Sequence, residues 1–135
     1  RREEAAQVAK GGYVVYDSAK PVVVMLATGS EVATLIEGAE LLAAEGIPVR
    51  VVNMPSEGLF RDQPRSYQES VLPQGVMRYG MTSGLPVNLL GLVGDESHIH
   101  GLNHFGFSAP YKVLDEKLGY TAENVYKQVK DFLAE

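Results

Sequence analysis

The chain has 135 residues, of which 45% are hydrophobic and 21% are charged, a composition typical of one folded domain and not of a disordered chain. Its formal net charge of −5 excludes a broadly cationic nucleic-acid-binding module. The absence of cysteine excludes disulfide scaffolds, thiolate zinc sites and a cysteine nucleophile, and it fits a reducing compartment. No apolar run approaches the roughly 18 residues of a membrane span. Because the first residue is arginine, we expect a piece of a longer chain.

The N-terminal stretch is expected to lie outside the folded unit. Residues 1–12 are charged and alanine-rich and end in two glycines, and we interpret them as a linker or a frayed helix from a preceding domain. The domain itself is expected to cover residues 13–135. Its first element is a short strand over residues 13–16, and a turn over residues 17–21 follows it.

The strongest pattern is a strand, a helix and a second strand. Residues 22–27 form a continuous apolar run rich in β-branched side chains, which is typical of a strand buried on both faces of a parallel sheet. The helix that follows is expected to end before Gly46, and residues 49–54 form the second strand. The apolar positions that recur with helical spacing are Val32, Leu35, Ile36, Ala39, Leu42 and Ala43.

The rest of the chain continues to alternate between strands and helices. The elements expected in chain order are a loop over 55–58, a helix over 63–71, a strand over 76–81, a strand or short helix over 87–93, a short strand over 97–102 and a helix over 110–118. The last helix is expected to be capped by Thr121, stapled by Tyr120 onto Val125, and buried along Val125, Val129, Phe132 and Leu133. This alternation predicts an α/β fold, built as a three-layer α/β/α sandwich.

The turn of Thr28, Gly29 and Ser30 is the candidate anion-binding loop. It follows a buried strand and precedes a helix, where backbone N–H groups can hold a phosphate. No G-x-G-x-x-G sequence and no Walker lysine accompany it, and Glu31 would repel an anion. The alternative is a helix start that caps itself, because Thr28 and Glu31 have the form of a capping box and Ser30 is a rival N-cap.

The three histidines of the chain, His98, His100 and His104, lie close together in the sequence. On a strand, His98 and His100 would point to one face, as a metal site requires, and Asp95 and Glu96 are near. Glycines flank the cluster and nothing in the sequence fixes His104. We therefore favour a polar sheet edge or a subunit contact over a metal site, and a general base remains open.

Serine and aromatic residues in the expected loops add no catalytic motif. None of the serines lies in a G-x-S-x-G nucleophile elbow. The aromatic residues that flank loops are expected to pack against a neighbouring domain or subunit, and these are Phe60, Phe105, Phe107 and Tyr111. The residues alone thus indicate an α/β domain without a self-contained active site.

Six segments of the chain, taken in order and at their spacing, carry a family resemblance. They are residues 11–14, 27–32, 49–56 with Phe60 and Gln63, 71–73 with Tyr67 before them, 105–110, and 119–121 leading to Val125. From about Gly11 to the end, the chain resembles the C-terminal domain of the transketolase family. Near Thr82, where relatives commonly carry a carboxylate, and near Leu89, where they carry an aromatic residue, this sequence departs from the pattern.

The resemblance implies an enzyme that uses thiamine diphosphate and a divalent metal, Mg or Ca, to move a two-carbon ketol unit between sugar phosphates of the pentose phosphate pathway. It implies a cytoplasmic homodimer of three-domain subunits, whose catalytic, cofactor and metal residues lie in the first two domains. No such residue is therefore assigned to this chain. The third domain of the family is a mostly parallel sandwich with one antiparallel strand, packed at the subunit interface and structural or regulatory. Its partners would be the other domains and the second subunit, with no nucleic acid and no membrane.

Other hypotheses remain open beside this one. A free-standing anion- or nucleotide-binding module would use the Thr28 turn, and a metal-dependent hydrolase would use the histidines. Deoxyxylulose-phosphate synthase and the β-type part of 2-oxoacid dehydrogenases share the architecture that the resemblance implies.

Overall fold

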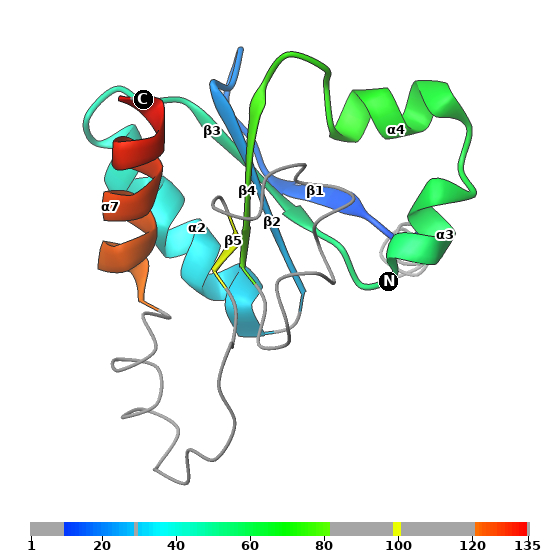
Figure 1. Cartoon of the computed structure of the whole chain (residues 1–135), viewed down its shortest axis with the longest axis horizontal. Coiled ribbons are helices and arrows are strands. Elements are labelled where there is room, and N and C mark those ends of the chain that lie inside the picture. The colour runs from blue at the N-terminus through cyan, green and yellow to red at the C-terminus, as the bar shows by residue number, and fades with distance from the viewer. Residues whose placement is uncertain (1–9, 29, 82–98, 101–120, 135) are drawn as a thin grey trace, which may run out of the picture.

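The structure is a computed structural model that describes residues 10–28, 30–81, 99–100 and 121–134. Its strands are β1 (Tyr13–Tyr16), β2 (Val23–Ala27), β3 (Val49–Asn53), β4 (Met77–Met81) and β5 (Ile99–His100). Its helices are α2 (Ser30–Ala43), α3 (Glu57–Arg61), α4 (Arg65–Val71) and α7 (Ala122–Leu133), as labelled in Figure 1. The expectations for residues 87–93 and 110–118 and for Tyr120 lie outside the described residues.

The described strands form one mixed sheet with the order β1-β3-β2-β4-β5. Strand β2 pairs in parallel with both β3 and β4, β4 pairs in parallel with β5, and β1 runs antiparallel to β3. The expected mostly parallel sheet with one antiparallel strand is therefore confirmed. In the register of β2 and β3, Ala27 lies opposite Asn53, so the carboxyl ends of these two strands meet at one edge of the sheet.

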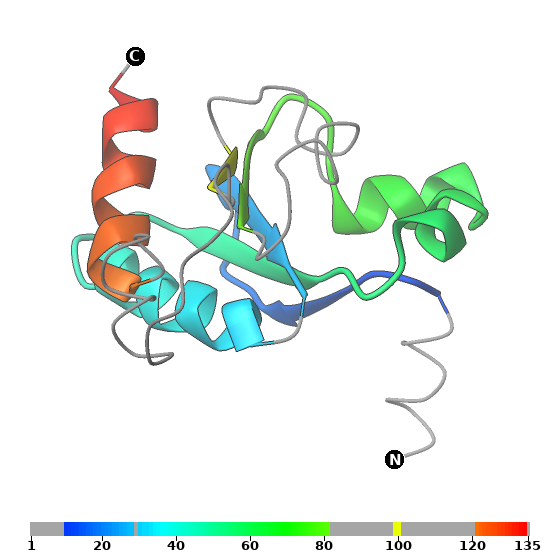
Figure 2. The same cartoon turned by 60° about the horizontal axis from the view of Figure 1, so that its bottom comes forward.

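Strand β2 lies at the centre of the molecule, because all five of its residues are buried. Its side chains alternate between two cores, as the two-residue period of a strand requires. Val23 and Met25 belong to the core under α2 and α7, and Val24 and Leu26 belong to the core that includes residues of α3 and α4. Figures 1 and 2 show these helix pairs on opposite sides of the sheet. The expected three-layer sandwich is confirmed.

Helices α2 and α7 pack closely against each other because a glycine faces the contact. A Cβ atom at Gly38 would lie only 2.7 Å from Cγ1 of Val125. Thr121 caps α7 as expected, since its side chain accepts a hydrogen bond from the backbone N–H of Asn124 at 3.2 Å. Val125 and Val129 are fully buried, but Leu133 is exposed, so the expected buried stripe was wrong at its last residue.

Helix α3 corrects the expectation of a loop after β3. Ser56 is its N-cap, and the Ser56 Oγ accepts a hydrogen bond from the Leu59 N–H at 3.2 Å. Phe60 is 1% exposed and packs edge-on against Tyr67, with their ring centroids 6.1 Å apart. Phe60 therefore belongs to the core of this chain, and the expectation that it contacts a neighbouring domain or subunit was wrong. The helix is only five residues long, too short to show an apolar period in the sequence.

The glycines before β1 also pack against α3. The Gly11 carbonyl accepts a hydrogen bond from the Ser56 N–H at 3.0 Å, and Gly11 and Gly12 are both buried. Gly11 has a φ of +83°, and a Cβ there would lie 2.3 Å from the Phe60 nitrogen. Only glycine fits this position. The boundary expected between residues 12 and 13 stays a prediction.

Candidate functional site

The expected anion loop lies at the carboxyl edge of the sheet. Thr28 follows β2 and is exposed, α2 begins at Ser30, and Gly29 lies outside the described residues. Because Gly29 is not described, the expected capping of α2 by Thr28 or Ser30 stays a prediction. Glu31 lies in the first turn of α2 and is buried, so a carboxylate already occupies this helix start. An anion site at this loop stays a prediction.

Asn53 is a polar residue at the same edge that the sequence reasoning missed. It ends β3 opposite Ala27, and its Nδ2 donates a hydrogen bond to the Tyr13 hydroxyl at 2.9 Å. Its Oδ1 is buried and accepts no hydrogen bond within the described part of the chain. A carbonyl oxygen of this kind attracts a donor such as water and repels an anion. The signal in the sequence was a polar residue at the end of a buried apolar strand.

A second candidate is a cavity of about 200 Å³ near α3, α4 and the start of β4. Buried Phe60 and Leu72 give it apolar walls, and the rest of the lining is polar or charged. The full lining is Phe60, Arg61, Arg65, Gln68, Glu69, Leu72, Gln74 and Arg78. Sequence reasoning did not find this cavity, because its three arginines are spread over 18 positions of the chain, from Arg61 to Arg78, with no motif spacing.

Hydrogen bonds to backbone carbonyls fix two of the lining side chains. Gln68 donates from its Nε2 to the carbonyls of Arg61 at 3.0 Å and Gln63 at 2.8 Å, which joins α4 to the end of α3. Arg78 donates from its Nη2 to the Leu72 carbonyl at 3.1 Å. Burial lowers the pKa of Arg78, yet an arginine in a protein keeps its charge.

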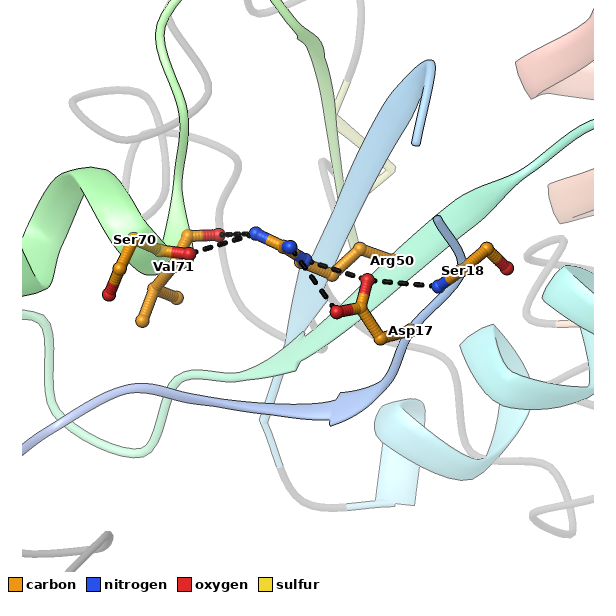
Figure 3. Close-up of polar contacts among 5 residues, drawn as sticks. All are labelled: Asp17, Ser18, Arg50, Ser70 and Val71. Carbon is orange, nitrogen blue, oxygen red and sulfur yellow. Dashed lines mark hydrogen bonds and ion pairs between the residues drawn. The ribbon is translucent and has the colours of Figure 1, made fainter. Parts of the chain in front are cut away.

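Arg50 holds α4 in place from the sheet (Figure 3). Its Nε and Nη2 donate to the two carboxylate oxygens of Asp17 at 2.9 and 3.2 Å. Its Nη1 donates to the carbonyls of Ser70 at 2.9 Å and Val71 at 3.2 Å, at the end of α4. A guanidinium presents its donors as a rigid planar fork, so one residue of β3 links the end of β1 to the end of α4. This contact positions the helix whose residues line the cavity.

The histidine cluster is largely outside the described residues. His98 and His104 are not described, and the backbone of His100 lies in β5, as the expected short strand predicts. Among residues 10–28, 30–81, 99–100 and 121–134, no group of three or more His, Cys, Asp or Glu residues could hold a metal ion. The divalent metal that the family resemblance implies is expected in the other domains, and its place stays a prediction. No helix in the described part is long and apolar enough to cross a membrane.

Comparison with known proteins identifies the family. A family model described as the transketolase-like TK C-terminal domain matches residues 11–121. The chain belongs to this family. It is similar to transketolase 1 of Vibrio vulnificus, with 44% identity over 134 residues, covering 98% of this chain and 20% of the relative. Transketolase 1 of Escherichia coli is 41% identical over 133 residues, covering 97% of this chain and 20% of the relative.

Solved transketolase structures have the same fold. The transketolase from Leishmania mexicana matches with a TM-score of 0.83 and 34% identity, over 93% of this chain and 18% of that chain. A transketolase from Pichia stipitis matches with a TM-score of 0.88 and 28% identity, over 96% of this chain and 19% of that chain. A protein described as a split gene transketolase, inactive β4 tetramer, matches with a TM-score of 0.63 and 28% identity, over 89% of this chain and 41% of that chain.

The match confirms the resemblance to the transketolase C-terminal domain inferred from the sequence. The chain spans about one fifth of the length of the relatives that it matches. In the described part of this transketolase C-terminal domain, Arg50 makes four hydrogen bonds that hold secondary structure elements together. Ser56, which lies in no nucleophile-elbow motif, caps α3.

Proposed function

We propose that this chain is the structural and dimer-interface domain of a transketolase and that it carries no catalytic residue. The observation that carries the proposal is coverage: 98% of the chain aligns with only 20% of a transketolase. Four fifths of such an enzyme then remain to supply the cofactor and substrate sites. The polar contacts of Arg50, Ser56 and Thr121 support the proposal, because each of these side chains links or caps secondary structure elements.

The whole enzyme would transfer a two-carbon ketol unit, a glycolaldehyde unit, between sugar phosphates of the pentose phosphate pathway. Thiamine diphosphate supplies the group that carries this unit, and it would be bound with Mg or Ca by the other domains. The enzyme would be a cytoplasmic homodimer, with no nucleic acid and no membrane as partner. The catalytic, cofactor and metal residues would lie in the other domains, so no step of the reaction is assigned to this chain.

Two features of the surface support a role at an interface. Strand β1 lies at one end of the strand order, and proteins commonly cover such an edge because its outer backbone groups can pair with another chain. Val15 on β1 and Leu59 on α3 are exposed apolar side chains. The description of the split gene β4 tetramer as inactive agrees with a reaction that needs further polypeptide.

The test is a set of domain exchanges in Escherichia coli transketolase 1, which is 41% identical to this chain over the matched region. One variant lacks the matched C-terminal fifth, and a second carries this chain in its place. We expect the truncated variant to lose dimer stability, measured by sedimentation, and the chimera to recover both the dimer and ketol transfer. A truncated variant that is as stable, dimeric and active as the parent would contradict the proposal.

A further inference from the structure

The cavity near α3 and α4 concentrates positive charge in an acidic protein. Three of its eight lining residues are arginines and one is a glutamate, whereas the whole chain has a net charge of −5. Gln68 and Gln74 add side-chain amides to the lining. Guanidinium and amide N–H groups are hydrogen-bond donors, and guanidinium groups match the geometry of carboxylate and phosphate oxygens.

Hydrogen bonds to backbone carbonyls fix two of these side chains, Arg78 and Gln68. Arg78 lies on β4 and is held by the Leu72 carbonyl, and Gln68 is held by two carbonyls near the end of α3. Arg50 fixes the end of α4 from the other side. Buried Phe60 and Leu72 form the apolar walls, and a poorly hydrated wall strengthens electrostatic attraction inside the cavity.

The negative charge in the lining is weakly engaged with the arginines. Glu69 approaches Arg65 with an oxygen to Nε distance of 3.8 Å, and its Oε1 lies 3.5 Å from Nε2 of Gln74. Both side chains of the ion pair are well exposed, at 86% for Arg65 and 50% for Glu69. Such an exposed pair contributes little to stability, so an entering anion would compete with Glu69 for Arg65.

We propose that this cavity binds a small oxyanion, the phosphate or carboxylate group of a small molecule, between Arg61, Arg65 and Arg78. Its volume of about 200 Å³ lies below the roughly 300–1,000 Å³ of sites for drug-sized ligands, so it fits one charged group better than a nucleotide. This site is separate from the Thr28 loop at the carboxyl edge of the sheet. It does not depend on the reaction of the whole enzyme.

The test is titration of the 135-residue chain with inorganic phosphate and, separately, with acetate, followed by calorimetry. We expect binding in the millimolar range or tighter, weakening as salt is added. Arg65→Gln should weaken binding roughly threefold to tenfold without unfolding the chain, because the Arg65 side chain is 86% exposed. Glu69→Gln should strengthen binding roughly threefold, because it removes the carboxylate from the lining.

Lys127→Gln is the matched control, because it removes one positive charge from the exposed surface of α7, an element that does not line the cavity. We expect its affinity to equal that of the parent. Binding of phosphate but not acetate would identify a site for phosphate groups. Binding of acetate would show that the site accepts carboxylate groups. The proposal is overturned if neither anion binds at millimolar concentration, or if Lys127→Gln weakens binding as much as Arg65→Gln.

Discussion

Replacing Arg50 by methionine tests whether the contact between β3 and α4 stabilises the fold. Methionine keeps most of the aliphatic stem and removes all the donors. The pair with Asp17 is half exposed on the carboxylate side, at 48%, so its loss should cost about 0.5–1 kcal/mol. The Nη1 bonds to the Ser70 and Val71 carbonyls come from a charged group that is only 15% exposed, and their loss should cost about 1.5–2 kcal/mol. Together, we expect Arg50→Met to lower the free energy of unfolding by about 2–3 kcal/mol.

The assay is equilibrium urea unfolding followed by circular dichroism, with Asp17→Asn as the matched variant. This variant keeps Arg50 and its carbonyl contacts and loses only the ion pair, so its free energy of unfolding should fall by no more than about 1 kcal/mol. Equal losses for Arg50→Met and Asp17→Asn would refute the reasoning, because the carbonyl contacts at the end of α4 would then contribute nothing. We also expect Arg50→Met to weaken phosphate binding in the cavity, since α4 would lose its anchor.

Three other variants test separate parts of the fold. Gly11→Ala forces a Cβ to within 2.3 Å of backbone atoms at a φ of +83°. It should therefore lower the free energy of unfolding by more than about 2 kcal/mol. A variant that melts at the same temperature as the parent would argue against the packing of Gly11 on α3. Thr121→Ala removes the cap that accepts from Asn124 and should cost about 1 kcal/mol in urea unfolding; an unchanged midpoint would show that the cap is not stabilising. Burial raises the pKa of Tyr67 above its ordinary 10.0, so the unfolded chain ionises first and stability should fall as the pH rises above about 10. Tyr67→Phe, which loses the bond to the Gly12 carbonyl, should cost about 1 kcal/mol at neutral pH and show a shallower alkaline fall, and equal slopes would contradict this assignment.

The centre of the sandwich could be predicted from the sequence because its signals are local. The apolar run of β2 is buried on both faces, as expected of a central parallel strand. Gly46 has a φ of +79° just after α2, which is the backbone conformation that glycine favours at a helix end. Thr121 is at the cap of α7 for a similarly local reason. Each of these features depends on a few neighbouring residues.

The features that were missed depend on contacts between distant residues. Helix α3 has too few residues to show a period, and it forms where Ser56 caps it and Phe60 enters the core. In the sequence, Arg50 is a single charged residue inside an expected strand. Its role depends on Asp17, 33 positions earlier, and on the end of α4. The cavity exists only because the fold brings α3, α4 and β4 together. Neither composition nor spacing reports such long-range contacts.

The most direct test of the central claim is a ketol-transfer assay on the purified 135-residue chain, with sugar phosphates, thiamine diphosphate and magnesium all present. If this domain only supports an active centre built by other parts of a transketolase, the rate will equal that of the reaction without protein. A rate that rises in proportion to the concentration of the chain, and disappears when thiamine diphosphate is left out, would contradict the account.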